Sequence, residues 1–470
     1  MFSQKTTFAL FFGNRGFFPG SLIAEARETM VRILQGLGHN VLIMPVEVTR
    51  YGAVETVEEG QKYAAFLREH RGEFGGVILC LPNFGDENGA LAALKACGVP
   101  ILVQAYPDEM EKMAPAFRRD AFCGKVSITD VFSQYGLKYT VLKPHTVHPS
   151  SSRFAANVDY FDRMCRVVGG MQEIVIGAIG ARTTAFKTVR IDELALQRNK
   201  IGVETLDLSE VFFRMRKLSP EDETYVTKAM TLKAYTSWQS APEKAFDNLV
   251  RLSVVLDALI AEYHMDAMAL RCWVEMQSQL GISPCVLLSE LNNRGIPSAC
   301  ELDLGNAVAM RALSLASGGP VTCLDWNNNY NDDDDRCILF HCGPVPKSMM
   351  TSAGRITDHA ILANSVGAGN AYGCDVGRIA PGAFTFGSLM TDAGQLRFYL
   401  GTGEFTGEAI PEDFFGCAGV AKIAKLQDVL LHICRGGHRH HVSVTTGQVM
   451  EPLVDALTNY LGYQVTCPQL

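Results

Sequence analysis

The sequence lacks the features that membrane-spanning and nucleic-acid-binding proteins need. No apolar run approaches the roughly 18 to 20 residues of a membrane-spanning helix, and the apolar stretch at 8–12 is too short for a secretory signal. There is no basic block, and 42 lysines and arginines stand against 50 aspartates and glutamates, which gives a formal net charge of −8. We therefore expect a cytoplasmic protein that binds neither a membrane nor nucleic acid.

The cysteines lack the spacing of a metal-binding or redox motif. All 14 are scattered singly between Cys80 and Cys467, and none forms a CxxC pair. Scattered thiols in apolar segments are typical of free, buried cysteines in a reducing compartment. The 470 residues are 47% hydrophobic and 20% charged, which is ordinary for a folded soluble protein. This length predicts about two to four domains.

The first part of the chain alternates short apolar runs with segments of helical spacing. Such alternation indicates βαβ units and a parallel sheet, so we predict a doubly wound α/β domain over residues 1–170. The expected strands lie at 7–12, 40–46, 76–81 and 99–104, and the expected helices at 21–37, 57–70 and 88–97.

A second α/β pattern and then a β-rich pattern follow. We predict a second doubly wound parallel-sheet domain over 171–320, with strands at 173–180 and 267–271 and helices at 241–263 and 282–294. After Pro320 the chain changes to short apolar runs punctuated by Gly, Asn and Asp, which predicts a mostly β domain over 321–470. Its expected elements are strands at 321–326, 336–341, 382–390 and 396–402 and one closing helix at 452–461.

A glycine-containing turn follows the first expected strand. Its sequence, Gly13-Asn14-Arg15-Gly16, is not the GxGxxG of a dinucleotide site, and bulky residues follow it. The turn therefore argues against a nucleotide-binding dehydrogenase. Arg15 lies where open α/β sheets bind ligands and is a candidate to contact an anionic or hydroxylated ligand. An arginine that only caps a surface turn explains the residue equally well.

Two carboxylates mark the ends of two further expected strands. Glu301 ends a short strand that precedes a helix near Gly305, and Asp325 ends the strand after Pro320. Two carboxylates placed in this way can hold a divalent cation and supply an acid and a base to one substrate. By spacing alone, two solvated acids near loops are the commoner situation.

The distribution of histidines strengthens this prediction. His341 ends an apolar run 16 residues after Asp325, and the pair His440-His441 precedes a β-branched run near the C-terminus. Imidazole together with carboxylate suits Mn, Fe, Co or Zn better than Ca. The residues thus predict a transition-metal site, although an exposed polar turn accounts for the histidine pair as well.

Taken together and in order, these motifs resemble those of the L-fucose and L-arabinose isomerase superfamily, and of its fucose-isomerase-like branch in particular. The resemblance extends over nearly the whole chain. It rests on the segments 13–19 (GNRGFFP), 271–275 (RCWVE), 299–303 (ACELD), 324–328 (LDWNN), 340–343 (FHCG) and 440–442 (HHV).

The resemblance implies a metal centre and an assembly. In that family a manganese ion, or another divalent cation, is held by residues that correspond to Glu301, Asp325 and His441, with His341 as a further ligand in the arabinose isomerases. The family fold implies two α/β domains and a C-terminal β domain, in homo-oligomers (trimer, tetramer or hexamer) whose active sites lie at subunit contacts. Arg15 would then reach the site of a neighbouring subunit.

The same resemblance implies a small-molecule sugar substrate and an aldose-ketose isomerisation. Glu301 and Asp325 are expected to move a proton between C2 and C1 through a cis-enediol, with a metal-mediated hydride shift as the alternative. The leading substrate alternative to a neutral sugar is an anionic one such as sulfoquinovose, and a sugar-binding protein without catalysis is a further alternative. The candidate substrate contacts are Arg15, Trp273, Glu275, Trp326 and Lys347.

Overall fold

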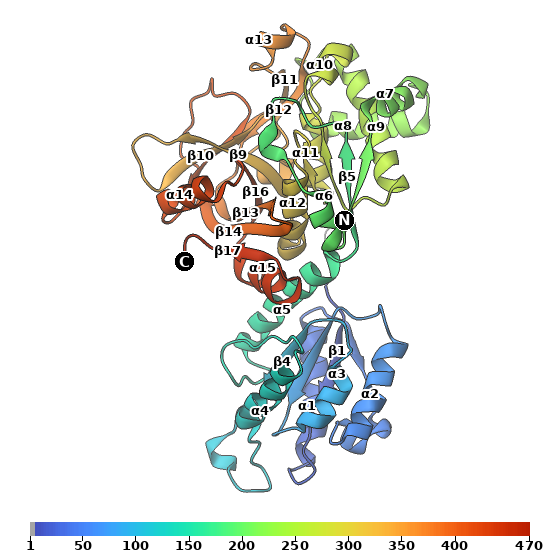
Figure 1. Cartoon of the computed structure of the whole chain (residues 1–470), viewed down its shortest axis with the longest axis vertical. Coiled ribbons are helices and arrows are strands. Elements are labelled where there is room, and N and C mark those ends of the chain that lie inside the picture. The colour runs from blue at the N-terminus through green and yellow to red at the C-terminus, as the bar shows by residue number, and fades with distance from the viewer. Residues whose placement is uncertain (1–4) are drawn as a thin grey trace. The chain divides into compact units, whose positions relative to one another are not determined.

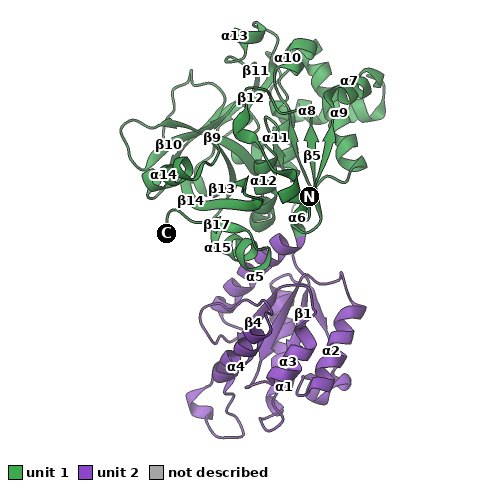
Figure 2. Cartoon of the chain, viewed as in Figure 1, with its two compact units in different colours: residues 1–2, 170–470 green, residues 3–169 purple. Residues whose placement is uncertain are grey.

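The computed structural model describes residues 5–470, which form two compact units divided between residues 169 and 170 (Figures 1 and 2). The first unit contains a four-stranded parallel sheet in the order β2-β1-β3-β4. Strands β1, β3 and β4 are buried along their whole length, as expected of a parallel sheet covered on both faces. The strands are β1 (Phe8–Phe12), β2 (Val41–Ile43), β3 (Gly76–Leu81) and β4 (Ile101–Ala105).

Helices flank this sheet, and their ends follow the usual capping chemistry. Thr56 and Asp86 each accept a backbone N–H bond at the start of a helix, which satisfies donors that a helix leaves unpaired. In the core, the ring of Phe11 from β1 meets the edge of Tyr63 with 5.2 Å between ring centroids. The helices are α1 (Ser21–Gly36), α2 (Val57–Glu69), α3 (Glu87–Leu94), α4 (Ala121–Gln134) and α5 (Ser152–Gly170).

The second unit begins with another four-stranded parallel sheet, in the order β6-β5-β7-β8. Its strands are β5 (Ile174–Ile179), β6 (Ile201–Leu206), β7 (Ala267–Leu270) and the two-residue β8 (Ser298–Ala299). Its helices are α6 (Glu193–Arg198), α7 (Leu208–Lys217), α8 (Glu223–Tyr235), α9 (Glu243–Glu262), α10 (Glu275–Leu280), α11 (Cys285–Asn293) and α12 (Leu304–Ser317).

The rest of this unit is a nine-stranded sheet that closes on itself. Antiparallel pairs join β15, β10, β9, β16, β13 and β14 in turn, and β14 also pairs with β15. A ring of this kind leaves none of its member strands as an exposed edge. The strands are β9 (Val321–Asn329), β10 (Arg336–His341), β11 (Arg355–Asp358), β12 (Tyr372–Arg378), β13 (Gly382–Asp392), β14 (Gln395–Phe405), β15 (Cys417–Lys422), β16 (His441–Thr446) and β17 (Gln464–Thr466).

The predicted fold class, two parallel-sheet α/β parts followed by a β-rich part, is confirmed. The division of the second unit at residue 320 stays a prediction. Two details of the sequence reading were wrong. The C-terminal part contains two helices that the sequence reading missed, α13 (Ala363–Val366) and α14 (Leu426–Gly436). The predicted closing helix itself is present as α15 (Met450–Asp455) and a π-helical turn at Ala456–Tyr460, and β17 follows. In addition, Asp325 lies inside β9, and the strand before Glu301 ends at Ala299.

The described residues also bear on the expected partners. Within 5–470, no helix combines the length and the apolar character needed to cross a membrane.

Candidate active site

Glu301 occupies a strained loop between β8 and α12. Both Glu301 and Leu302 have a left-handed φ of 58°, a conformation that costs energy for residues other than glycine and that gathers at functional sites. The indole Nε1 of Trp273 donates a hydrogen bond of 3.0 Å to Oε1 of Glu301. The other carboxylate oxygen, Oε2, lies 2.8 Å from Nε2 of His441. Glu301 is thus held from two sides.

Three neighbouring strands supply the other charged groups of the site. Asp325 of β9 pairs in register with His441, the first residue of β16, and His341 is the last residue of β10, on the other side of β9. Oδ1 of Asp325 lies 3.5 Å from Nε2 of His441. One donor atom of each of the three residues lies within 4.8 Å of the other two. Strand pairing therefore assembles residues that are far apart in the sequence.

The donor atoms of this group fit a cation. Oδ1 of Asp325, Nε2 of His341 and Nε2 of His441 are buried and have no hydrogen-bond partner among the described residues. The short approach of His441 to Glu301 is an ion-pair distance without hydrogen-bond geometry. Buried polar atoms without partners are costly, and a divalent ion between them removes that cost. Carboxylate and imidazole donors suit a transition metal such as Mn²⁺.

His441 is held in place from behind by Asp303, which the sequence analysis did not choose as a site residue. Oδ2 of Asp303 lies 2.8 Å from Nδ1 of His441, and the other carboxylate oxygen pairs with Arg439. Asp303 also begins α12 by accepting the backbone N–H of Asn306 at 3.0 Å. All of these side chains are buried. A carboxylate behind a histidine fixes the ring and leaves its outer nitrogen free for a ligand.

The two carboxylates of the site differ in their electrostatic environment. Burial raises the pKa of Asp325, and although His341 opposes this, the pKa stays above its ordinary value. Burial acts in the same direction on Glu301, but the ion-pair contact with His441 outweighs it and the pKa of Glu301 is lowered. For His441, burial is outweighed by Asp303 and Glu301, which raise its pKa well above the ordinary value. Two carboxyl groups with pKa values pushed apart suit acid and base roles.

Glu301, Asp325 and His341 face a pocket of about 260 Å³. Polar and charged groups occupy one part of its wall and apolar and thiol groups the rest. The lining residues are Cys272, Trp273, Ser283, Cys285, Glu301, Asp325, Phe340, His341, Cys342, His359, Ile361 and Leu362. A small molecule that enters it meets both carboxylates.

Comparison with known proteins agrees with this arrangement. Residues 9–172 match the family model described as "Fucose/sulfoquinovose isomerase, N-terminal domain", and residues 339–467 match "L-fucose isomerase, C-terminal domain". The chain belongs to the fucose isomerase-like family. The two matches lie in the expected order and together take in more than half of the chain, so the resemblance found in the sequence is confirmed.

Several relatives carry the name sulfoquinovose isomerase. Those of Alkalicoccus urumqiensis and Priestia aryabhattai are each 23% identical over 62% of this chain and 64% of their own length, just under two thirds. That of Clostridium sp. (strain MSTE9) is 23% identical over 65% of this chain and 67% of its own. A solved structure described as a putative two-component system response regulator/ggdef domain protein covers 55% of this chain at 11% identity and a TM-score of 0.18, too slight a likeness to inform the fold.

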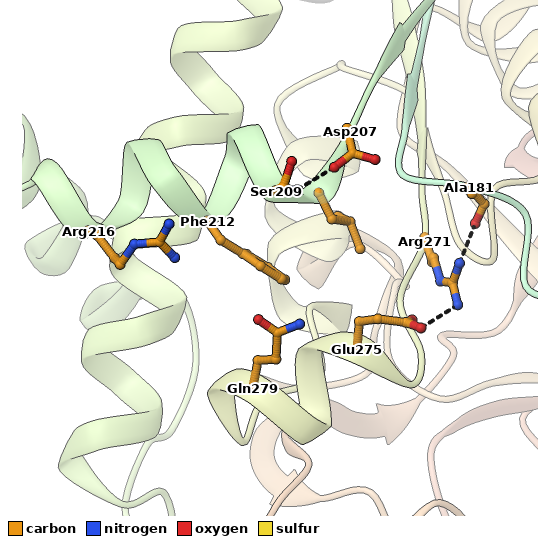
Figure 3. Close-up of a pocket in the computed structure, with 9 residues that line it drawn as sticks. Ala181, Asp207, Ser209, Phe212, Arg216, Arg271, Glu275 and Gln279 are labelled. Carbon is orange, nitrogen blue, oxygen red and sulfur yellow. Dashed lines mark hydrogen bonds and ion pairs between the residues drawn. The ribbon is translucent and has the colours of Figure 1, made fainter.

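In this member of the family, Trp273 lines the 260 Å³ pocket and its contact with a substrate stays a prediction, whereas Glu275 lies elsewhere. Figure 3 shows Glu275 with its carboxylate toward the guanidinium of Arg271, 2.6 Å away, in a separate pocket of about 420 Å³. That pocket is also lined by Asp207, which caps the N-terminus of α7, and by Ser209 and Arg216 of α7 (Figure 3). Contact between Glu275 and a substrate in the site of Glu301 stays a prediction that the described geometry does not favour.

The remaining candidate residues also lie outside the described lining of the 260 Å³ pocket. Trp326 donates a hydrogen bond of 3.1 Å to the hydroxyl of Tyr399. Lys347 has its Nζ 5.9 Å from the ring centroid of Tyr235. Arg15 belongs to the first unit, where it pairs with Glu87 and lies over the ring of Phe84 at 4.4 Å. A substrate contact by any of these three stays a prediction.

Proposed function

We propose that this chain is a metal-dependent aldose-ketose isomerase. The single observation that carries the proposal is the meeting of Asp325, His341 and His441, with partnerless buried donor atoms, beside Glu301 at one pocket. A site that only binds sugar needs no such cluster. The family membership and the names of the relatives support the same reaction class.

The reaction exchanges one C–H bond for another. The C2–H bond of an open-chain aldose breaks, a C1–H bond forms, O2 becomes a carbonyl oxygen and O1 becomes a hydroxyl. Glu301, whose pKa is lowered, is ionised at neutral pH and can accept the C2 proton and return it to C1. Asp325, whose pKa is raised, lies across the site and can exchange a proton with a sugar oxygen. This division of roles follows the general rule for acid and base pairs.

The metal ligands in this proposal are Glu301, Asp325 and His441, with His341 as a further ligand. A divalent cation bound there would polarise the substrate carbonyl and stabilise negative charge on the sugar oxygens. Trp273 donates a hydrogen bond to Glu301 and so orients the carboxylate. Phe340, Ile361 and Leu362 supply apolar side chains to the wall of the pocket.

Proton transfer and hydride shift predict different isotope patterns. A proton held on Glu301 exchanges with solvent, so turnover of an aldose in D₂O should place deuterium at C1 of the ketose. A hydride shift moves hydrogen directly and places none. Deuterium incorporation measured by NMR therefore decides between the two mechanisms, and its absence would overturn the role proposed for Glu301.

The names of the relatives favour a sulfonated hexose as a second, more specific candidate substrate. Among the described residues, the lining of the 260 Å³ pocket contains no arginine or lysine. An anionic substrate therefore requires a cation from elsewhere, and Arg15 of a neighbouring copy in a homo-oligomer is our candidate. This arrangement requires a homo-oligomer, and a cytoplasmic trimer, tetramer or hexamer is the assembly that we propose.

The deciding experiment is a conversion assay on the purified protein. The panel comprises L-fucose, L-arabinose, D-arabinose and sulfoquinovose, each tested before and after chelation and again after Mn²⁺ is restored. Chelator-sensitive conversion that is lost in Glu301→Gln and kept in the exposed-site control Asp413→Asn is the expected result. Tight metal binding without turnover of any sugar would contradict the isomerase and favour a sugar-binding protein.

A further inference from the structure

Part of the active-site pocket comes from the segment that follows β11. His359, Ile361 and Leu362 of this segment line the 260 Å³ pocket together with the proposed metal ligands. The side chain of His359 is only 8% exposed. Among the described residues, His359 belongs to none of the groups of donor atoms that could share one ion, whereas His341 belongs to two of them. His359 therefore borders the pocket without being placed to hold the metal.

Hydrogen bonds of the main chain fix His359 at the base of this segment. The backbone N–H of His359 donates to the carbonyl oxygen of Ala371 at 3.1 Å. The carboxylate of the preceding Asp358 accepts the backbone N–H groups of Gly369 and Ala371, at 2.7 and 2.9 Å. The ring of His359 also lies against that of Phe415, with 5.0 Å between the ring centroids. The two ends of the loop are thus tied together, which gives the imidazole the defined position that a ligand contact requires.

The hydrogen bonding of the ring leaves one donor unused. Nδ1 of His359 accepts the backbone N–H of Leu362 at 3.3 Å, so the proton of the uncharged imidazole is on Nε2. This Nε2 makes no hydrogen bond with a described residue, and in contrast to Nε2 of His341 it is not completely occluded. Polar groups in buried side chains nearly always have a partner. The unused N–H is therefore available to an oxygen atom of a ligand in the pocket.

We propose that His359 is a specificity-determining residue that donates its Nε2–H to a hydroxyl oxygen of the sugar beyond C3. The inference rests on the proposed function, in which C1 and C2 of the open-chain sugar lie at the metal ligands. Since His359 does not belong to that group of ligands, the oxygens that it meets are those farther along the sugar chain.

The neighbours of His359 suit the same end of the sugar. Ile361 and Leu362 offer apolar contact to C–H groups, and Ile361 is 59% exposed, which places it at the mouth of the pocket. A sugar without an oxygen at this position leaves the N–H of His359 unpaired and binds more weakly. His359 thus selects sugars by the presence and configuration of one hydroxyl, and it does not replace the cation that a sulfonate requires.

Two substitutions at His359 test the contact by steady-state kinetics on the sugar that the panel identifies. His359→Phe keeps a planar ring and removes the donor, whereas His359→Gln keeps a donor. We expect KM to rise about 10-fold in His359→Phe and to recover in part in His359→Gln. Because the contact is made equally in the ground state and the transition state, kcat should change little, and the Mn²⁺ affinity should equal that of the unaltered chain. The control is His70→Phe, at the end of α2 and outside the pocket.

Alditols test the same contact without turnover, because they carry the hydroxyls of the sugars and have no carbonyl group. L-Fucitol, L-arabitol, D-arabitol and the alditol of sulfoquinovose are titrated into the Mn²⁺-loaded, full-length protein and followed by calorimetry. We expect at least one of them to bind, and the tightest one to bind about 10-fold more weakly to His359→Phe. His359→Gln should again lie between the two.

The possible outcomes separate this contact from the isomerase itself. The proposal is overturned if no alditol binds, or if His359→Phe leaves KM and alditol affinity unchanged. It is also overturned if His359→Phe lowers kcat and Mn²⁺ affinity at constant KM, which would assign His359 to the metal centre. Alditol binding that depends on His359, in a chain that converts no sugar, would contradict the isomerase and leave the contact standing. Conversion that is independent of His359 would do the reverse.

Discussion

Oδ2 of Asp303 and Nδ1 of His441 lie 2.8 Å apart in a fully buried contact, and the opposite ring nitrogen of His441 faces Glu301 and Asp325. Asp303 accepts the Nδ1 proton and so leaves Nε2 as the ring nitrogen that faces the two carboxylates. Burial disfavours a charge on Asp303, but Arg439 and His441 outweigh this and hold its pKa well below the usual range. It is therefore ionised throughout the physiological pH range.

The first prediction concerns this contact. Asp303→Asn keeps the size of the side chain and the cap of α12, but an amide cannot fix the histidine tautomer as a carboxylate does. We expect Mn²⁺ affinity and kcat each to fall by about 10-fold to 100-fold. Mn²⁺ binding measured by electron paramagnetic resonance, with the exposed Asp413→Asn as the control, is the readout. Unchanged metal affinity in a folded Asp303→Asn protein would show that Asp303 only supports the fold.

The second prediction concerns Trp273, whose indole donates to Oε1 of Glu301 at 3.0 Å. Trp273→Phe keeps an aromatic wall and removes the donor. A hydrogen bond to a charged group contributes about 1.5 to 3 kcal/mol, so we expect kcat to fall by about 10-fold or more with metal affinity nearly unchanged. Steady-state kinetics on the sugar identified by the panel, together with Mn²⁺ titration, separates the two effects. A rise in KM alone would assign Trp273 to substrate contact.

Local patterns in the sequence predicted the α/β parts because periodicity and turn signals belong to each segment itself. The strands around Leu10 and Ile78 and the helix around Leu256 lie where their spacing placed them. The helix at 426–436 carries the same kind of signal, with Leu426, Val429 and Ile433 buried on one face, and was overlooked among the strands. Its recognition required only the period of 3.6 residues.

Other features depend on contacts between distant residues, which no local pattern shows. Closure of the ring depends on the pairing of Glu404 with Lys422. The contact between the thiols of Cys285 and Cys342 likewise joins residues that are 57 positions apart. Asp303 could have been found as the third residue of Glu301-Leu302-Asp303, but an aspartate at a helix start is ordinary. Its role becomes visible only in the structure, where its carboxylate contacts Nδ1 of His441.

The third prediction separates the two adjacent histidines. Nε2 of His441 is buried without a hydrogen bond, whereas the side chain of His440 is 41% exposed and its Nε2 lies 3.7 Å from Asp325. We expect His441→Ala to abolish stoichiometric Mn²⁺ binding and His440→Ala to reduce the affinity less than about 10-fold, since Asp303 orients only His441. Isothermal titration of both variants with Mn²⁺ compares them directly. Equal losses would mean that both imidazoles hold the ion.

The last prediction concerns stability and uses Asp375 of β12, which is fully buried. Its Oδ1 accepts a 2.7 Å hydrogen bond from Thr236, but its Oδ2 has no partner among the described residues. Burial raises the pKa of Asp375 to about 6. Because the folded chain then holds this proton more tightly than the unfolded chain, the free energy of unfolding should fall as pH rises from about 4 to about 6.

Asp375→Asn removes the ionisation and keeps an acceptor for Thr236. Above pH 6 we expect the variant to be more stable than the unaltered chain by on the order of 2 to 3 kcal/mol, and near pH 4 the difference should nearly vanish. Urea unfolding of the second unit at pH 4.5 and pH 8, with Asp413→Asn as the exposed control, measures both values. A variant that is less stable at pH 8 would show that the charged carboxylate has a cation partner in the folded protein, and the sign of the pH dependence would then reverse.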